Sequence, residues 1–283
     1  MKAERYVVIP FIVLPTIFLV VISVYPLAYS LFLSLFRGLL DQFIGLKNYA
    51  DMLADRRFHD AVYVTLAFTT ITVGLEVLLG LLLAGSLILS SVERKSWWQT
   101  VYIVPMAIPP VVSGVIWKIL YHPSFGPLNL LALIRMPVPD PLGQPSLALL
   151  AVSLINIWMW TPFAFLVFYS GIGAVRQEII ESALIDGASK VQIFRSIVLP
   201  SLRTLILVVI FWRFTANLTA FDEIMGSTEG GPGFTTTTLT MFAYWIGFKS
   251  WDLGYAASAA VYLLLVVAVV GSSLFGRLGI VRE

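Results

Sequence analysis

Long, uninterrupted apolar runs separated by shorter polar segments organise the chain. The six runs cover residues 6–36, 61–89, 97–121, 146–170, 199–221 and 253–275. A helix needs about 20 apolar residues to cross a hydrocarbon core, and continuous rather than alternating runs exclude barrel strands. The pattern therefore predicts an all-α integral membrane protein with six transmembrane helices, folded as one domain over residues 1–283.

Composition agrees with a membrane setting. Hydrophobic residues make up 59% of the chain and charged residues 12%, whereas soluble domains carry about 25% charged residues. The first run is longer than the apolar core of a signal peptide, so we expect an uncleaved first span. With no cysteine and only the two histidines His59 and His122, thiol chemistry and a histidine-rich metal site are not expected. The net charge of +2 gives no indication of a nucleic-acid partner.

Loop charges set the expected orientation. If both termini lie inside, Lys and Arg outnumber Asp and Glu in the inner segments and are outnumbered in the outer ones, where Asp222 and Glu223 are counted. Cytoplasmic loops carry an excess of Lys and Arg. We therefore expect cytoplasmic N- and C-termini, which places residues 176–200 in the cytoplasm between spans four and five.

The cytoplasmic segment contains the stretch ESALIDGASKVQIFRSIVLP, from Glu181 to Pro200. Its apolar residues recur at spacings of three to four, which predicts a helix with one apolar face. Gly187 interrupts that helix and is expected to kink it or to let another backbone approach. The apolar face comprises Ala183, Leu184, Ala188, Val191 and Phe194. An interfacial helix on the inner leaflet is one interpretation.

The same stretch resembles the EAA loop of ATP-binding-cassette import permeases, with Ser182 in place of the second Ala. In that family the loop forms a coupling helix that docks in a cleft of a cytoplasmic ATPase. The resemblance implies that the apolar face is covered by a partner protein rather than by lipid. The residues it assigns to ATPase coupling are Glu181, Ala183, Asp186, Gly187, Ala188 and Phe194.

Other segments resemble the carbohydrate-importing, maltose-transporter-type branch of the family. STEGGPGFTTTTLTMFAYWIGF (Ser227–Phe248) resembles the sequence after the fifth span, with Gly-Gly-Pro followed by threonines. IGLKNYADML (Ile44–Leu53) and PSFGPLNLL (Pro123–Leu131) resemble outer loops of the family. The resemblance thus covers nearly the whole chain.

Polar residues and prolines within the spans are candidates for a substrate path. VPMAIPP in span three contains Met106 and Pro110, and its prolines predict either a packing kink or a broken helix that lines the path. NIWMW in span four contains Asn156, Trp158 and Trp160. These side chains suit an interhelical hydrogen bond and an interfacial aromatic belt, or equally a sugar site.

Span five carries Arg213 and Asn217, four residues apart and therefore on one helix face. An intramembrane Arg must face protein or water. Arg213 is expected either to bind hydroxyls or an anionic group of the substrate, or to pair with Glu76 in span two.

The resemblance implies a sugar site on Asn156, Trp158 and Asn217. That family has a contacting Tyr and Ser where this chain has Met106 and Pro110, and a Ser where it has Arg213. A glycan site is therefore expected without maltose specificity.

The sequence contains no G-x-x-x-x-G-K-[ST] phosphate loop and no evident Ser/His/Asp or Cys/His set. We therefore expect that this chain is not an enzyme and that it binds no cofactor itself. The leading hypothesis is a permease subunit in the plasma (inner) membrane of an ATP-driven importer of sugars. The resemblance implies a homologous second permease as heterodimer partner, two ATPase subunits that bind ATP and Mg, an extracellular or periplasmic solute-binding protein, and surrounding lipid.

Three alternatives remain open. The same importer class could carry a polyol or glycerol phosphate, with Arg213 binding the anion. An ion-coupled secondary transporter would usually show internal repeats, and none is evident. A membrane scaffold without transport would tolerate changes at Asn156, Trp158 and Asn217.

Overall fold

The computed structural model describes residues 2–89 and 96–277, and the side chains of residues 11–86 and 100–273. Part of the charge bias behind the predicted orientation rests on Glu93, Arg94, Lys95, Arg282 and Glu283, which lie outside the described residues.

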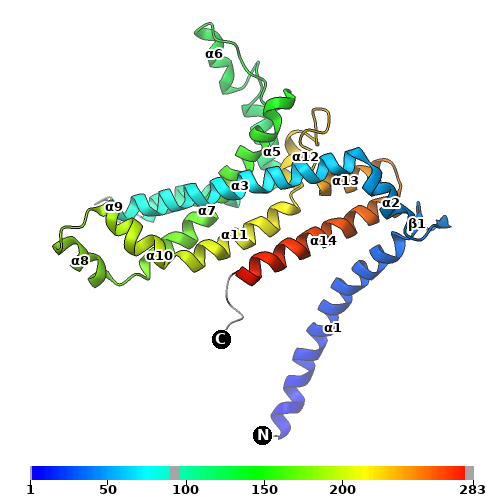
Figure 1. The fold of residues 1–283 in the computed structure, drawn as a ribbon, viewed down its shortest axis with the longest axis horizontal. Helices are drawn as coiled ribbons and strands as arrows, with labels where there is room; N and C mark the ends of the chain where they lie inside the picture. Colours follow the sequence, from blue (N-terminus) through cyan, green and yellow to red (C-terminus); the bar gives the residue numbers. More distant parts are fainter. Residues whose placement is uncertain (1, 90–95, 278–283) are drawn as a thin grey trace. The chain divides into compact units, whose positions relative to one another are not determined.

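Four of the predicted spans are single long helices (Figure 1). They are α1 (Lys2–Leu33), α3 (Arg56–Leu89), α7 (Pro145–Gly173) and α14 (Leu253–Arg277). Each has a stretch long and apolar enough to cross a membrane. The helices predicted for spans one, two, four and six are thereby confirmed, although α1 ends at Leu33 rather than at residue 36.

The other two predicted spans are sharply bent. In the third, α4 (Ser96–Ala107) and α5 (Pro110–Leu120) meet at 101°. Pro109 precedes α5 and Pro110 opens it, and neither can donate a backbone hydrogen bond to continue α4. In the fifth, α9 (Lys190–Ile193), a π-helical turn (Phe194–Val198) and α10 (Leu199–Ser201) lead into α11 (Arg203–Leu218) at 64°. Among the described residues there are thus four candidate spans, or six if each bent pair is one span.

Shorter elements connect these helices. The strands β1 (Phe36–Arg37) and β2 (Gln42–Phe43) form an antiparallel hairpin, which corrects the all-α prediction at this one point. The short helices are α2 (Lys47–Ala54), the 3-10 turn Pro127–Asn129, α6 (Leu130–Leu133), α8 (Gln177–Ile185), α12 (Asp222–Ser227), α13 (Leu239–Tyr244) and the π-helical turn Trp245–Lys249.

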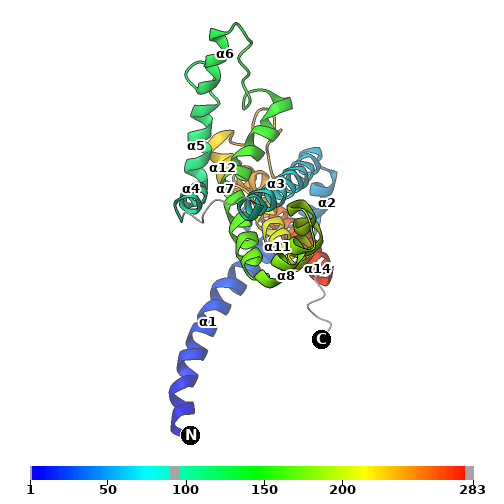
Figure 2. The same ribbon diagram turned by 90° about the vertical axis from the view of Figure 1, so that its left-hand side faces the viewer.

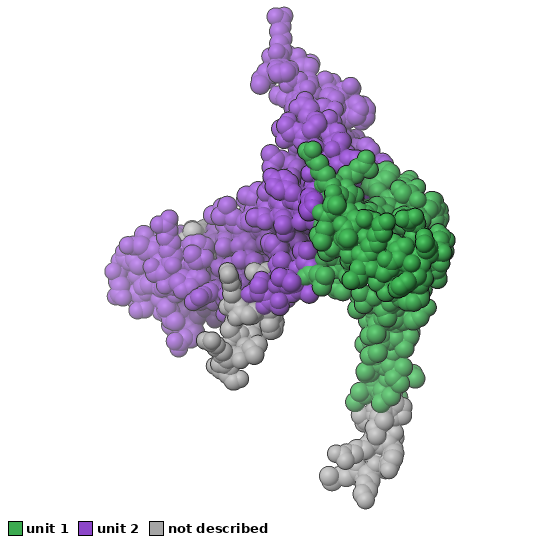
Figure 3. Space-filling model, turned by 45° about the vertical axis from the view of Figure 1, so that its right-hand side comes forward, with its two compact units in different colours: residues 1–58, 242–265 green, residues 59–241, 266–283 purple. Residues whose placement is uncertain are grey.

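The chain forms two compact units, which Figure 3 colours separately. The smaller comprises residues 1–58 and 242–265. In it, the Asn48 amide donates to the carbonyls of Ser34 and Phe36, at 2.8 Å each, and so fixes the turn after α1. The larger comprises residues 59–241 and 266–283 and contains all the candidate site residues.

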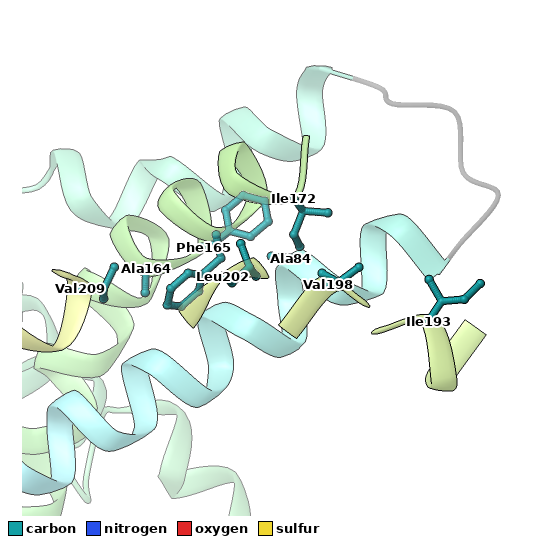
Figure 4. Close-up of a cluster of buried hydrophobic side chains, with 9 residues drawn as sticks. Ala84, Ala164, Phe165, Ile172, Ile193, Val198, Leu202 and Val209 are labelled. Atoms are coloured by element: carbon teal, nitrogen blue, oxygen red, sulfur yellow. The ribbon is translucent and has the colours of Figure 1, made fainter. Parts of the chain in front are cut away.

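The larger unit has a hydrophobic core between α3, α7 and the bent fifth span. Figures 1 and 2 show α3, α7 and α11 side by side, and Figure 4 shows the core side chains between them. The core contains Ala84 of α3, Phe165 of α7 and Val209 of α11. Its remaining buried members are Ala164, Phe168, Ile172, Ile193, Val198 and Leu202.

The threonine-rich loop after α12 is held by its own hydroxyl groups. Thr237 donates to the Gly230 carbonyl at 2.8 Å and Thr238 to the Ala220 carbonyl at 2.9 Å. The Thr65 hydroxyl of α3 accepts from the Leu239 backbone N–H at 2.8 Å. Gly230 has φ +90°, which a side chain would strain. The loop is thus tied both to the end of α11 and to α3.

A glycine allows α3 to approach α7 closely. A Cβ added at Gly80 would lie 2.7 Å from the Ala164 Cβ, closer than real Cβ atoms come, and 3.0 Å from the Ala164 carbonyl carbon. A Cβ at Gly74, in the same helix, would meet nothing within 4 Å.

We predict that Gly80→Ala lowers the thermal unfolding midpoint of the purified chain in mild detergent. Overpacking a tight contact costs typically 1–3 kcal/mol, more than the roughly 1 kcal/mol of helix propensity that Ala gains over Gly. Gly74→Ala is the matched control and should leave the midpoint unchanged or raise it. Equal midpoints for the two variants would contradict the close α3–α7 contact.

Candidate substrate path and coupling segment

A bidentate ion pair occupies the interior of the larger unit. Arg213 of α11 is 1% exposed and Glu76 of α3 is fully buried. The Arg213 Nε donates to Glu76 Oε2 at 2.7 Å, and Nη2 donates to Oε1 at 3.0 Å. The structure therefore forms the second of the two arrangements expected for Arg213, the pair with Glu76.

Two amides extend the pair into a network. Arg213 Nη2 also donates to Asn156 Oδ1 at 3.1 Å and to Asn217 Oδ1 at 2.7 Å. The Asn217 Nδ2 donates to Thr72 Oγ1 at 2.7 Å, and the Asn156 Nδ2 donates to Glu223 Oε1 at 2.6 Å. The network joins α3, α7, α11 and α12.

Helical spacing brings these groups together. α3 supplies Thr72 and Glu76, and α11 supplies Arg213 and Asn217. α7 supplies Asn156 and Trp160. Residues four apart share a helix face, so each helix presents two groups to the same interior point.

The Trp160 indole completes the enclosure of the guanidinium. The Arg213 Cζ lies 4.4 Å from the centre of the Trp160 ring. A cation over an indole face is stabilised by the ring quadrupole, more so when water is excluded. Trp160 therefore acts on the buried charge rather than on the pocket described next.

A pocket of about 510 Å³ lies on another face of α7, between α4 and α5. Trp158 and Trp117 meet edge to face there, with ring centres 5.6 Å apart. Tyr102, Tyr121, Thr161 and Phe165 also line it, among mostly apolar neighbours. The pocket is thus built mainly of aromatic and aliphatic side chains.

The predicted substrate residues fall into three groups. Asn156, Trp160, Arg213 and Asn217 meet in the buried network, whereas Trp158 lines the pocket. Met106 and Pro110 are half-buried, and neither lies in the network contacts nor in the pocket wall.

Sequence reasoning missed other parts of the site. Glu223 was expected in an outer loop, but it is 4% exposed and bonds Asn156. Thr72, Trp117 and Thr161 were not singled out. The spacing of Thr72 to Glu76, which repeats that of Arg213 to Asn217, is a signal that could have found Thr72.

The coupling segment, residues 176–200, is not the single helix that was expected. α8 ends at Ile185, and Gly187 has φ +83° in a left-handed cap. The Ala188 N–H donates to the Ala183 carbonyl at 2.9 Å, which closes the helix end. Ser189 then begins α9 in a capping box with Gln192. Among the described residues no other backbone approaches Gly187, since an added Cβ would meet none of their atoms within 4 Å.

The predicted apolar face also divides. Ala183, Ala188 and Phe194 pack against the hydrophobic core, and a Cβ at Gly85 of α3 would lie 2.8 Å from the Phe194 ring. Leu184 and Val191 of that face are instead 48% and 54% exposed, and Ile185, which was not part of the predicted face, is 87% exposed. Glu181 and Asp186 are exposed beside them. A hollow of about 350 Å³, with Asp186, Gly187 and Ala188 in its wall, lies at the same corner.

Residues 76–277 match the model of one protein family, the binding-protein-dependent transport system inner membrane component. This chain belongs to that family. It is therefore a membrane component of a transport system, as expected, and the family is not one of enzymes.

Two relatives show how far the similarity extends. The chain is 35% identical over 260 residues to a probable ABC transporter permease protein, y4oQ, of Sinorhizobium fredii, which covers 89% of this chain and 84% of the relative. It is 35% identical over 230 residues to the trehalose/maltose transport system permease protein MalF of Thermococcus litoralis, which covers 80% of this chain and 76% of the relative.

The fold is also similar to a solved structure, a bacterial ABC transporter involved in the import of the acidic polysaccharide alginate. The TM-score is 0.87 at 22% identity, over 100% of this chain and 98% of that one. The fold of an ABC importer permease is therefore shared.

We predict strong coupling between Arg213 and Glu76 in a double-mutant cycle. Arg213→Met and Glu76→Leu each leave one charge buried without its partner, which costs about 3–5 kcal/mol, whereas removing both replaces the pair by apolar groups. The thermal midpoint of the double variant should lie well above that expected from adding the two single losses. Strict additivity would contradict the ion pair.

Proposed function

We propose that this chain is the transmembrane permease subunit of an ATP-driven, binding-protein-dependent importer of sugars or oligosaccharides. The family match over residues 76–277 carries this proposal. The trehalose/maltose permease among its relatives and the alginate importer among similar folds support a carbohydrate substrate.

In this proposal the four single helices and the two bent pairs form six spans of one permease domain. Both termini and the coupling segment, residues 176–200, lie in the cytoplasm of a cell whose inner membrane holds the complex. The bends in spans three and five support the transport role, because irregular backbone at membrane depth is tolerated where it is buried in protein or lines a cavity.

α8 is the proposed coupling helix. Its C-terminal end carries exposed Leu184 and Ile185 next to exposed Asp186, a composition suited to docking in a cleft of an ATPase. Glu181, Gly187 and Asp186 would contact the ATPase, while Ala183, Ala188 and Phe194 would transmit its motion to the core on which they pack.

The partners follow from this mechanism. A loaded solute-binding protein docks outside on this chain and a homologous second permease. Two ATPase subunits bind ATP and Mg and close on each other. This closure moves the coupling helices and opens the path outward. Hydrolysis of ATP returns the path to its inward-open state. This chain supplies half of the path.

The predicted substrate residues take two parts in this proposal. Trp158, with Met106 and Pro110 on the neighbouring bent span, belongs to the path. Asn156, Trp160, Arg213 and Asn217 are engaged with one another, so a substrate would reach them only when the network opens.

The Arg213–Glu76 pair weighs against the version of this function in which Arg213 binds a glycerol phosphate. A phosphate would have to displace a carboxylate that is already held by two hydrogen bonds. The relative named as a probable ABC transporter permease weighs against an ion-coupled transporter.

We predict that Ile185→Asp abolishes co-purification of an ATPase with the tagged chain from its native membrane in mild detergent. The side chain is 87% exposed, so the change should spare the fold while placing a charge in the apolar contact. The second permease should still co-purify.

Leu133→Asp is the matched control, because Leu133 of α6 is 79% exposed and lies in the proposed outer loop. It should retain the ATPase. If neither the wild-type chain nor the control recovers an ATPase, the proposed function is wrong. If Ile185→Asp still recovers the ATPase, α8 is not its docking helix.

We predict opposite accessibility for single cysteines at the same two positions. The chain has no cysteine, so Leu133→Cys and Ile185→Cys each report one site. In intact spheroplasts a membrane-impermeant maleimide should label Leu133→Cys within minutes and label Ile185→Cys only after permeabilisation. The reverse pattern would invert the proposed orientation.

A further inference from the structure

The aromatic pocket on α7 contains buried polar atoms that have no hydrogen-bond partner in the part of the chain that the structure describes. The Thr161 side chain is 8% exposed, and its Oγ1 makes no hydrogen bond among the described residues. The Trp117 Nε1 is likewise buried and unpaired. Both residues line the pocket. A buried polar atom without a hydrogen-bond partner costs free energy. These two atoms therefore indicate that a polar ligand binds in the pocket.

Two prolines leave backbone acceptors at the same wall. Pro162 of α7 has no N–H to bond the Trp158 carbonyl four residues earlier, and Pro105 of α4 leaves the Val101 carbonyl in the same position. All four residues line the pocket. The wall therefore combines two unpaired side-chain groups with two residues whose carbonyls lack their usual helical donor.

Most of the wall is apolar and aromatic. The rings of Trp117 and Trp158 stand edge to face, and Tyr102, Tyr121 and Phe165 complete the aromatic part. A ligand that suits such a wall has apolar faces to lie against rings and hydroxyl groups at its rim. A pyranose ring has both, whereas an acyl chain has no group for the unpaired atoms of Thr161 and Trp117.

The charges of the pocket wall and its surroundings limit the class of ligand further. In the part of the chain that the structure describes, no charged side chain lines the pocket. Arg213, the one fully buried cation among the described side chains, is held by Glu76 and by two amides. Glu223 adds a second carboxylate to the same network, where it accepts from the Asn156 amide. An anionic ligand would find no compensating charge here.

We propose that this pocket is a binding site for one neutral sugar ring on the translocation path, in which Thr161 and Trp117 hydrogen-bond hydroxyls of the sugar and Trp158 packs on its apolar face. The proposal rests on the proposed function, because it gives the substrate class and the residues of that path. Thr161 and Trp117 would be specificity-determining residues.

Thr161→Val and Trp117→Phe test the site. Thr161→Val removes the hydroxyl at nearly the same side-chain volume, whereas Trp117→Phe removes the indole N–H together with one of the two fused rings. The complete importer, with its ATPases and saturating binding protein, would be placed in proteoliposomes and supplied with trehalose. We expect each variant to transport about ten-fold less trehalose per ATP hydrolysed, the equivalent of about 1.4 kcal/mol, at an unchanged ATPase rate.

Two control variants make the same chemical changes elsewhere. Thr70→Val alters an exposed threonine of α3, and Trp251→Phe alters a tryptophan that is 72% exposed. Both should transport trehalose at the wild-type ratio. A ratio within two-fold of wild type for both Thr161→Val and Trp117→Phe would overturn the proposal. A wild-type complex that neither binds an ATPase nor transports any sugar would overturn the proposed function instead.

Ligand class is tested by fluorescence of Trp117, taken as the difference between the wild-type complex and Trp117→Phe. Trehalose should change this signal, and sn-glycerol 3-phosphate at the same concentration should not. In a second experiment the same fluorescence is measured with the complex in vesicles whose lipids have dibrominated acyl chains, which quench a tryptophan that they contact. Quenching of Trp117 by these chains, unrelieved by trehalose, would show a lipid occupant and overturn the proposal, as would an equal response to the phosphate.

Discussion

The guanidinium of Arg213, buried in the middle of α11, constrains the larger unit more than any other group. A charged side chain at the bilayer centre is costly unless protein or water compensates it. Arg213 receives a carboxylate, two amide oxygens and an indole face, and these come from α3, α7 and α11. Because Glu76 of α3 and Asn156 of α7 both bond Arg213, a shift of either helix along α11 would break a hydrogen bond of the buried charge, so the polar contact helps to align the apolar packing around it.

The same ion-pair network links the segment of residues 176–200 to the aromatic pocket on α7. The π-helical turn and α10 continue directly from α9 into α11, which carries Arg213. Through Asn156 the network holds Glu223 of α12. α12 in turn packs on α5 backbone to backbone, since a Cβ at Gly114 would lie 3.0 Å from Gly226. A displacement of α9 thus has a continuous packed route, by way of α11 and α12, to the helix that carries Trp117.

Sequence reasoning could predict the parts that depend on local pattern. Apolar run length placed the four single helices, and the prolines of VPMAIPP marked the break before α5. Sequence reasoning also limited Arg213 to two arrangements, because a buried charge needs a partner and another predicted span contains Glu76. Choosing between them required knowing that α3 and α11 are neighbours, which no local pattern contains.

Long-range placement explains the remaining misses. Glu223 looks like a loop acid because the apolar run ends before it, but the chain turns back at α12 and buries it against Asn156. The coupling stretch has helical periodicity throughout, yet Gly187 adopts a left-handed φ and ends α8. Periodicity does not distinguish one helix from two that continue the same spacing across a cap.

The separation of charge from the pocket has a consequence for selectivity. An importer whose path held an accessible arginine would favour anions and would bind them tightly in a low-dielectric setting, which slows release. Here the network confines its charges among four helices, and α7 presents Asn156 to that network and Trp158 to the pocket, two residues apart. The proposed contacts of the pocket with a sugar are then single hydrogen bonds and ring contacts, each worth about 1 kcal/mol. Contacts of that size can orient a sugar ring yet let it leave, which is what a site on a path, as distinct from a storage site, requires.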